Sequence, residues 1–380
     1  MHHGIKKLLL LGAGQAHLQV LARLARHHPG NLDVILLTPF PHHTAPGCLP
    51  GFMAGQHTAD EGRVALEPLV RAAGARWLQG RCTGLDVASR QVQVAATGGA
   101  QGVPATLGYD LLSIDTGTVP DRARFDAEMP GANHHALHLS PLEAFVALWP
   151  QVMALAQQQA VSVAVVGAEA DGIELVFAAE QGIREHGLPG ARFTLVTGGG
   201  EVGTELPAAV RQRVLRQLRR RGITVLREAC VGMSEGEVHL GNGARLACDV
   251  PLMATGLCAP AWLQTSGLAL DDRGQVLTGP TLQSTSHPQV FATGGVAARA
   301  DGAPGDMHAG MALAHNLLAA HEGGALRALP ARRPRIALLA CGTGHAIANW
   351  GPVTLSGAWV WGWKDRIDRG FLEQHRVTRR

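Results

Sequence analysis

The sequence contains one short pattern twice: a run of apolar residues, a turn of small residues, and then a stretch with helical periodicity. In the first copy these are 6–11, the turn Gly12-Ala13-Gly14-Gln15-Ala16-His17, a helix over about 15–28 and a second strand over 33–37. In the second copy they are 161–166, the turn Gly167-Ala168-Glu169-Ala170-Asp171-Gly172, a helix over about 172–186 and a strand over 192–196. Continuous apolar strands joined to helices by tight turns are typical of parallel sheets covered on both faces. The repeated pattern therefore predicts an α/β fold with two Rossmann-like, three-layer domains.

Other segments complete these two predicted units. Residues 76–97 have the alternating apolar positions of hairpin strands, and 109–117 and 248–256 each form a strand that ends in Thr-Gly. A further strand covers 290–295, and a helix is predicted over about 308–321, from His308 onward. The rest of the chain, 331–380, is a separate tail that is rich in Trp near its end.

Length and composition exclude several classes of protein. A chain of 380 residues has room for two or three domains, and 46% hydrophobic residues rule out wholesale disorder. The net charge of +3 is too small to argue for nucleic acid. The six Cys include no CxxC pair, which argues against a disulfide framework or a zinc knuckle and favours a reducing compartment. No stretch reaches the ~18 apolar residues of a spanning helix, so we expect a cytoplasmic protein.

The glycine turns carry the candidate chemistry. A strand, a turn of small residues and a helix let backbone N–H groups and the helix dipole approach a pyrophosphate closely. The alternative is that the glycines only tighten the packing of strand against helix. Two such turns in one chain, each followed by a later strand that ends in Thr-Gly, favour dinucleotide binding.

With these motifs, the chain resembles the FAD-dependent pyridine nucleotide-disulfide oxidoreductase superfamily. The resemblance rests on the strands Leu112-Ser113-Ile114-Asp115-Thr116-Gly117 and Leu252-Met253-Ala254-Thr255-Gly256, on Phe291-Ala292-Thr293-Gly294-Gly295-Val296-Ala297, and on the run 266–291 that leads into it. The segment 14–21 and the tail segment 361–369 resemble one subgroup, similar to type II NADH dehydrogenases and associated with selenide, water dikinase.

The resemblance implies a domain arrangement and a set of binding residues. Residues 1–120 and 257–330 would form a discontinuous FAD-binding domain, 121–256 an inserted NAD(P)-binding-like domain, and 331–380 a C-terminal cap on the flavin side. Nicotinamide would stack on the isoalloxazine for hydride transfer, with no catalytic side-chain acid or base required. The implied cofactor-binding residues are Gly12, Ala13, Gly14, Gln15, Ala16, Thr38, Cys48, Leu49, Pro50, Thr116, Gly117, Gly294, Gly295 and Val296 for FAD, with Gly167 and Glu174 on the nicotinamide side.

The chain departs from the family pattern at several of these positions. Gly295 replaces an Asp that binds the ribityl chain, and Thr38 replaces the acid that holds the adenosine ribose. Glu169 replaces the middle glycine of the second turn, where a carboxylate would repel a pyrophosphate. Thr197 stands where the second ribose-binding acid is expected, so no preference between NADH and NADPH follows. His17 replaces the third glycine of the first turn, and we interpret it as a packing residue.

The His and Cys residues leave two further hypotheses open. Nineteen His suggest a metal site, but neither His42-His43 nor the cluster 134–138 has matching ligands, so no metal is predicted. His42 and His43 could instead contact the flavin. Cys48 and Cys341 could meet beside the flavin, as in sulfide:quinone oxidoreductases, or each could be a small apolar filler.

We therefore expect a flavin-dependent NAD(P)H dehydrogenase that passes electrons to a quinone or a similar acceptor. The alternatives are a degenerate, weakly binding scaffold and a thiol-assisted enzyme of the sulfide:quinone type. In the tail, apolar residues alternate with Lys364, Arg366 and Arg369, which suits peripheral contact with the inner face of the cytoplasmic membrane, or packing on the body or on another subunit. The apolar residues of this segment are Trp350, Trp359, Trp361, Trp363, Ile367, Phe371 and Leu372.

Overall fold

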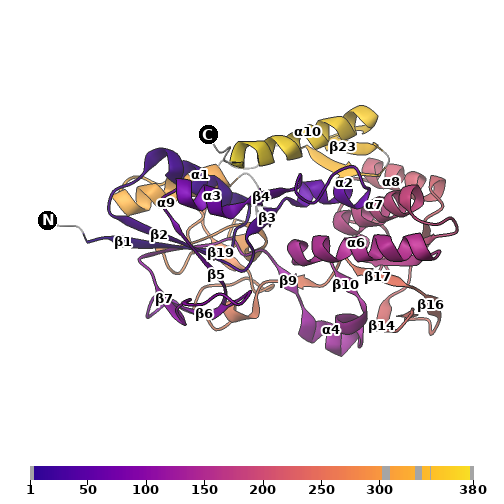
Figure 1. Ribbon diagram of the computed structural model, residues 1–380, viewed down its shortest axis with the longest axis horizontal. Helices are drawn as coiled ribbons and strands as arrows, with labels where there is room; N and C mark the ends of the chain where they lie inside the picture. The colour runs from indigo at the N-terminus through magenta and orange to yellow at the C-terminus, as the bar shows by residue number, and fades with distance from the viewer. Residues whose placement is uncertain (1–3, 302–308, 330–335, 343, 377–380) are drawn as a thin grey trace.

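The structure is a computed structural model that describes residues 4–301, 309–329, 336–342 and 344–376. Two sheets flanked by helices lie side by side, and a smaller sheet with a long helix lies along one edge of both (Figure 1). We call the two larger parts the first unit and the second unit, and the smaller part the tail.

The first unit is built on a sheet of seven strands in the order β20-β8-β1-β2-β5-β6-β7. The bounds are β1 Lys6–Leu11, β2 Leu32–Thr38, β5 Arg76–Asp86, β6 Gln91–Ala96, β7 Thr106–Gly108, β8 Leu111–Ile114 and β20 Val290–Ala292. The strands from β20 to β5 pair in parallel, whereas β6 and β7 extend the sheet in antiparallel fashion. The carboxyl ends of β1, β8 and β20 therefore lie next to one another.

Residues 8–11 of strand β1 are all Leu because both faces of the strand are covered there. Leu8 and Leu10 pack against α1 (Gln15–His27), α3 (Leu66–Ala72) and α9 (Gly310–Glu322). Leu9 and Leu11 point to the opposite face and pack with residues of β5, β6 and η2 (Ala261–Leu263). This arrangement is the structural reason for the continuous apolar run.

The second unit has five parallel strands in the order β10-β17-β11-β12-β13. Their bounds are β10 Leu137–His138, β11 Ser162–Val166, β12 Arg192–Val196, β13 Thr224–Leu226 and β17 Val250–Met253. One face is covered by α6 (Leu142–Gln158), α7 (Ala170–His186) and α8 (Ala208–Arg220). The other is covered by α4 (Arg122–Glu128), α5 (Ala132–His135) and an antiparallel sheet of β14 (Cys230–Ser234), β15 (Glu237–Leu240) and β16 (Arg245–Ala247).

The chain passes between the units through two paired strands. It leaves the first unit along β9 (Val119–Pro120) and returns along β18 (Leu257–Cys258), and these strands pair in antiparallel fashion. Short elements then complete the first unit: β3 (His42–Thr44) with β4 (Arg63–Ala65), β19 (Val276–Thr278) with β21 (Ala297–Arg299), η1 (Pro46–Cys48), α2 (Leu49–Met53) and η3 (Gly294–Val296). The first unit is thus finished by strand β20, which follows the second unit in the chain.

The tail lies against both units. Its antiparallel strands are β22 (Ala337–Ala340), β23 (Ala346–Trp350) and β24 (Val353–Gly357), and α10 (Ala358–His375) follows them. Leu339 and Ile347 pack into the core of the second unit. Ala346 and Ala348, on the other face, pack against Val360 of α10. The small sheet is therefore enclosed between the second unit and α10.

The predicted α/β class with two Rossmann-like, three-layer domains is confirmed by this architecture. The strands expected at 6–11 and 192–196 have those bounds, whereas α7 begins at Ala170, ahead of the predicted start at Gly172. Residues 76–97 do form paired strands, but β5 also belongs to the main sheet. The expected helix start at His308, the expected boundary after residue 330 and Thr343 lie outside the described residues. Among the described helices, none combines the length and apolar character that crossing a membrane requires.

Candidate functional site

The turn after β1 requires glycine at its first position. Gly12 has φ +84°, and a Cβ there would collide with the backbone of Asp115 and Thr116. Its N–H donates to Leu37 O at 2.8 Å, which holds the turn against the end of β2. The turn therefore lies directly beside the end of β8, and helix α1 begins at the residue after Gly14.

Three predicted groups of residues meet at this edge of the sheet. They are residues 12–16 at the start of α1, Thr116 and Gly117 after β8, and 294–296 after β20. Gly294 has φ +71°, and a Cβ there would lie 2.7 Å from the Asp115 carboxylate. Thr38 ends the neighbouring strand β2 and is buried. The sheet order thus gathers the residues expected around the dinucleotide.

Asp115, which belongs to the first Thr-Gly strand but was not among the predicted site residues, lies at the centre of this group. Its carboxylate accepts hydrogen bonds from the backbone N–H of Ala16 at 3.0 Å and of His17 at 3.3 Å. The side chain is buried, and burial raises the pKa of Asp115, although the nearby His17 opposes the shift. The carboxylate is also so close to Gly14 that a Cβ at Gly14 would collide with it.

His17 is a packing residue in the structure, as its sequence context suggested. Its ring is fully buried between Gly12 O, 2.6 Å from Nδ1, and Ser113 Oγ, 2.8 Å from Nε2. Burial lowers the pKa of His17, so the ring is neutral and holds the turn through hydrogen bonds.

One of the buried polar atoms near the turn, His43 Nε2 of β3, has no hydrogen-bond partner among the described residues. Burial lowers the pKa of His43 to about 4, and the Ala13 backbone beside it opposes this shift. His42, the other His considered for flavin contact, is half-buried. An unpaired buried nitrogen beside Ala13 fits a polar ligand at this place.

The loop with Cys48, Leu49 and Pro50 forms η1 and the start of α2, under helix α10. Lys364 of α10 is buried, and its Nζ donates to Gly47 O and to Asp368 Oδ2, both at 2.9 Å. Of the two alternatives for the tail, these contacts of Lys364 favour packing on the body for this residue, because its ammonium points into the protein. Burial raises the pKa of the Cys48 thiol to about 11.

Glu174 lies in α7, which packs against α2. Its carboxylate accepts a hydrogen bond from the Ala340 N–H of the tail at 2.6 Å. Burial raises the pKa of Glu174, and Lys364 opposes the shift. Glu174 therefore connects the second unit to the tail at the place where both approach the Cys48 loop.

The turn of the second unit is more open to solvent. Gly167 has φ +115°, and a Cβ at Gly172 would collide with the Gly167 carbonyl, so helix and turn are in close contact. Glu169 is exposed and makes no capping hydrogen bond to α7. The first N–H of α7, from Ala170, instead donates to Glu205 Oε1 at 2.8 Å.

The structure offers no support for a Cys48–Cys341 pair, and little for a metal site. Cys48 and Cys341 are both free thiols, and they pack in different apolar clusters. Burial raises the pKa of Cys341, so neither thiol is readily ionised. Within the described ranges, no three His, Cys, Asp or Glu side chains are grouped so that they could hold a metal ion.

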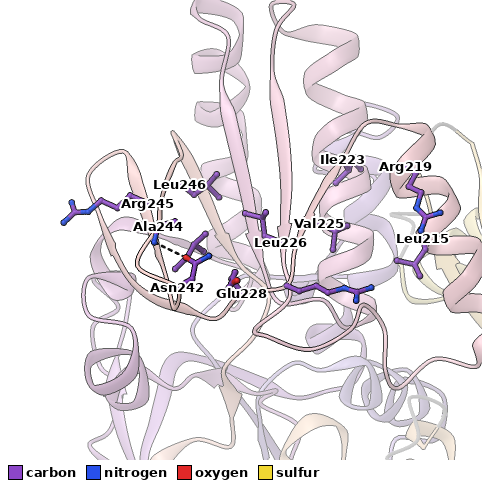
Figure 2. Close-up of a pocket in the computed structure, with 12 residues that line it drawn as sticks. Leu215, Arg219, Ile223, Val225, Leu226, Glu228, Asn242, Ala244, Arg245 and Leu246 are labelled. Atoms are coloured by element: carbon purple, nitrogen blue, oxygen red, sulfur yellow. Dashed lines mark hydrogen bonds between the residues drawn. The ribbon is translucent and has the colours of Figure 1, made fainter.

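An open groove of about 690 Å³ lies elsewhere, between α8, β13 and the β15–β16 hairpin (Figure 2). Apolar side chains such as Leu226 line its floor, and Arg219 and Arg245 lie at its ends. It contains none of the predicted binding residues.

Comparisons with known proteins agree with the geometry. A family model described as pyridine nucleotide-disulphide oxidoreductase matches residues 6–321. No curated protein sequence matches the chain. Among solved structures, the sulfide:quinone oxidoreductase of Aquifex aeolicus is similar, with a TM-score of 0.75 and 17% identity over 98% of this chain and 91% of that chain. NDH2 of Plasmodium falciparum, solved in complex with NADH, has a TM-score of 0.77 and 12% identity over 97% of both chains.

Proposed function

The chain belongs to the pyridine nucleotide-disulphide oxidoreductase family, and from this premise we propose that it is a flavin-dependent NAD(P)H dehydrogenase that passes electrons to a quinone-like acceptor. One observation carries the proposal: the glycine turn, the Thr116-Gly117 turn and the 294–296 segment meet at the carboxyl ends of adjacent parallel strands. Dinucleotides bind at this place in doubly wound sheets.

The residues at this edge fit FAD. The turn 12–16 would hold the diphosphate through backbone N–H groups, and Thr38 would lie on the ribose side. His43 Nε2 would gain a polar partner. The Cys48 loop, together with Thr116-Gly117 and 294–296, would line the rest of the cofactor. When bound, FAD supplies hydride-accepting chemistry, and the protein supplies orientation and electrostatics.

NAD(P)H would bind the second unit at the Gly167 turn, with Glu174 on the nicotinamide side. The contact between α2 and α7 supports this arrangement because it brings the Cys48 loop and Glu174 into one region. The domain division follows: 1–120 with 257–330 for FAD, 121–256 for NAD(P)H, and 331–380 as a cap over the Cys48 loop.

We also assign the chain to the subgroup that resembles type II NADH dehydrogenases and is associated with selenide, water dikinase. The tail signature supports this assignment, because its charged residues make specific contacts. Asp365 binds His57 at 2.9 Å, and Arg369 lies 2.8 Å from the other ring nitrogen of His57. The quinone-like acceptor would approach from this side of the Cys48 loop.

The test is the absorbance spectrum of the purified chain, followed by anaerobic addition of NADH. We expect flavin bands that NADH bleaches and a quinone restores. Gly14→Ala should abolish the bands because its Cβ would project into the binding edge. Gly30→Ala is the matched control, since nothing lies within 4 Å of a Cβ there. A protein that takes up no FAD would instead support the non-catalytic scaffold.

The thiol-assisted alternative is tested by replacing Cys48 and Cys341 with Ser. Their raised pKa values argue against thiolate chemistry. We expect both variants to keep NADH:quinone activity, and loss of sulfide-dependent quinone reduction in either one would favour the alternative.

We propose, in addition, that the tail touches an anionic membrane surface. Trp350 and Trp359 are 57% and 58% exposed, Val353 and Leu355 are also exposed, and Arg366 adds a positive charge. Co-sedimentation with vesicles of anionic lipid should fall when both Trp are replaced by Ser. Unchanged co-sedimentation would contradict this contact.

A further inference from the structure

Asp115, which directly follows strand β8, caps the N-terminus of helix α1. The cap residue of α1 is Gly14, which has no side chain with which to accept the first N–H groups of the helix. Asp115, at the end of β8, takes that role by accepting from Ala16 and His17. An acidic group at a helix N-terminus is favourable, so this contact stabilises the turn.

The same carboxylate fills the space through which a diphosphate reaches the helix. In dinucleotide-binding turns, the second glycine lets the backbone approach the pyrophosphate closely. Here the second glycine is Gly14, and the Asp115 carboxylate lies against it. Gly294, across the edge, would also place a Cβ 2.7 Å from Asp115 Oδ1. The Asp115 side chain thus lies between Gly14 and Gly294.

The second unit provides an internal comparison. At the position equivalent to Asp115, the strand that ends in Thr-Gly carries Ala254, and the third glycine of the turn is present as Gly172. A Cβ at Gly172 would lie 3.3 Å from Ala254 Cβ, so the methyl group fills this corner without a charge. The first unit replaces both residues, with Asp115 and His17. The carboxylate is therefore specific to the proposed FAD-binding unit.

We infer that Asp115 is an internal competitor for the FAD diphosphate, which makes FAD a dissociable cofactor whose affinity falls as pH rises. This inference rests on the proposed function. The diphosphate and the carboxylate would compete for the Ala16 N–H, and two anions at one helix N-terminus repel each other. Protonation of Asp115 removes the repulsion, and rotation of its side chain vacates the space.

The titratable side chains around Asp115 are neutral histidines, so they do not offset the repulsion between its carboxylate and a diphosphate. His17 of α1 is the titratable group nearest to it, and burial lowers the pKa of that ring. His43 of β3, beside Ala13, is also neutral, because burial lowers its pKa to about 4. The pKa of Asp115 itself is raised by burial.

The experiment measures the dissociation constant of FAD for the full-length chain, by quenching of flavin fluorescence, from mildly acidic to mildly alkaline pH. In the wild type we expect the constant to increase with pH. Asp115→Asn keeps the size of the side chain and should remove this pH dependence. Asp115→Ala, which restores the residue of the second unit, should bind FAD about tenfold more tightly at alkaline pH.

Asp110→Asn is the matched control. Asp110 lies one residue before β8, is not fully buried and accepts from the Lys7 N–H at 2.7 Å, so its variant should behave as the wild type does. Equal, pH-independent affinities in the wild type and both Asp115 variants would overturn the inference while leaving the proposed function intact. Failure of every protein, Asp115→Ala included, to bind FAD would instead overturn the proposed function.

Discussion

At the scale of single residues, the burial of Asp115 affects stability as well as binding. Its raised pKa means that the folded protein holds the proton more tightly than the unfolded chain does. This contribution to the free energy of unfolding is complete below the ordinary pKa of Asp and is lost as pH rises through the raised value. Asp115→Asn does not titrate. Urea denaturation should therefore show the variant gaining stability relative to the wild type as pH increases.

A constant difference between the two proteins across this pH range would show that the Asp115 carboxylate does not change its protonation on unfolding. Asp86→Asn is a useful comparison, because hydrogen bonds from Ser89 and Ala88 lower the pKa of Asp86. Asp86 contributes stability that is lost as pH falls, which is the opposite of the pH dependence expected for Asp115.

Gly295 is the second residue with a measurable consequence. Restoring the family's Asp there should tighten FAD binding through a hydrogen bond to the ribityl chain, by about tenfold for about 1.4 kcal/mol. A Cβ at Gly295 would lie 2.9 Å from Thr118 Cγ2, which is too close. We therefore expect Gly295→Asp with Thr118→Ser to bind FAD more tightly than Gly295→Asp alone. Titration of FAD into the three proteins measures this, with Thr118→Ser alone as the control.

The sequence predicted the glycines of this site but not the side chain that fills it. Gly12 and Gly14 belong to a spacing with a known physical role, whereas Asp115 is one acid at the end of an apolar strand. Its contact with Gly14 depends on the order of β8 and β1 in the sheet, which local sequence does not specify. Aligning the two Thr-Gly strands, which places Asp115 opposite Ala254, is the signal that could have found it.

At the scale of elements, the N-terminus of α7 is held by a surface carboxylate. The Ala170 N–H donates to Glu205, and Glu169 precedes it without a capping role. Glu205→Ala should free this N–H for a diphosphate and lower the Michaelis constant for NADH. Glu169→Gly should lower it at least about tenfold by removing charge and bulk. Steady-state kinetics with NADH checks both, and Glu201→Gln on the same loop serves as the control.

An unchanged Michaelis constant in Glu169→Gly would mean that its exposed side chain points away from bound nucleotide. The elements themselves were accessible from sequence because the buried parts of strands such as β1 and β11 are apolar runs that lead into glycine turns. The position of α10 could not be predicted from the sequence. Its apolar and charged residues suited a membrane surface as well as a protein surface, and only the tertiary contacts of Lys364 distinguish the two for that residue.

At the scale of the whole molecule, Lys364 ties the tail to both units. Its ammonium binds Gly47 O of the first unit and lies near Glu174 of the second. Lys364→Met would leave the partly buried Gly47 carbonyl and Asp368 carboxylate without this donor, and we expect a loss of about 1–3 kcal/mol. Urea denaturation should show this loss, with faster amide exchange in α10. Arg366→Met, at an exposed position, should change stability by less than about 0.5 kcal/mol. Equal stability of both variants would contradict a structural role for Lys364.

The pairing of β8 with β20, which lie far apart in the sequence, affects the order in which the protein can fold during synthesis. Because β20 follows the whole second unit in the sequence, a ribosome must synthesise that unit before the first sheet can close. Translation at about 5–20 residues per second leaves the nascent sheet with β8 as an open edge for many seconds, and open edges pair readily with other chains. Gly294 arrives with β20, so the cofactor site is among the last parts of the protein to emerge. FAD, on this order of events, enters a chain whose second unit has already been synthesised.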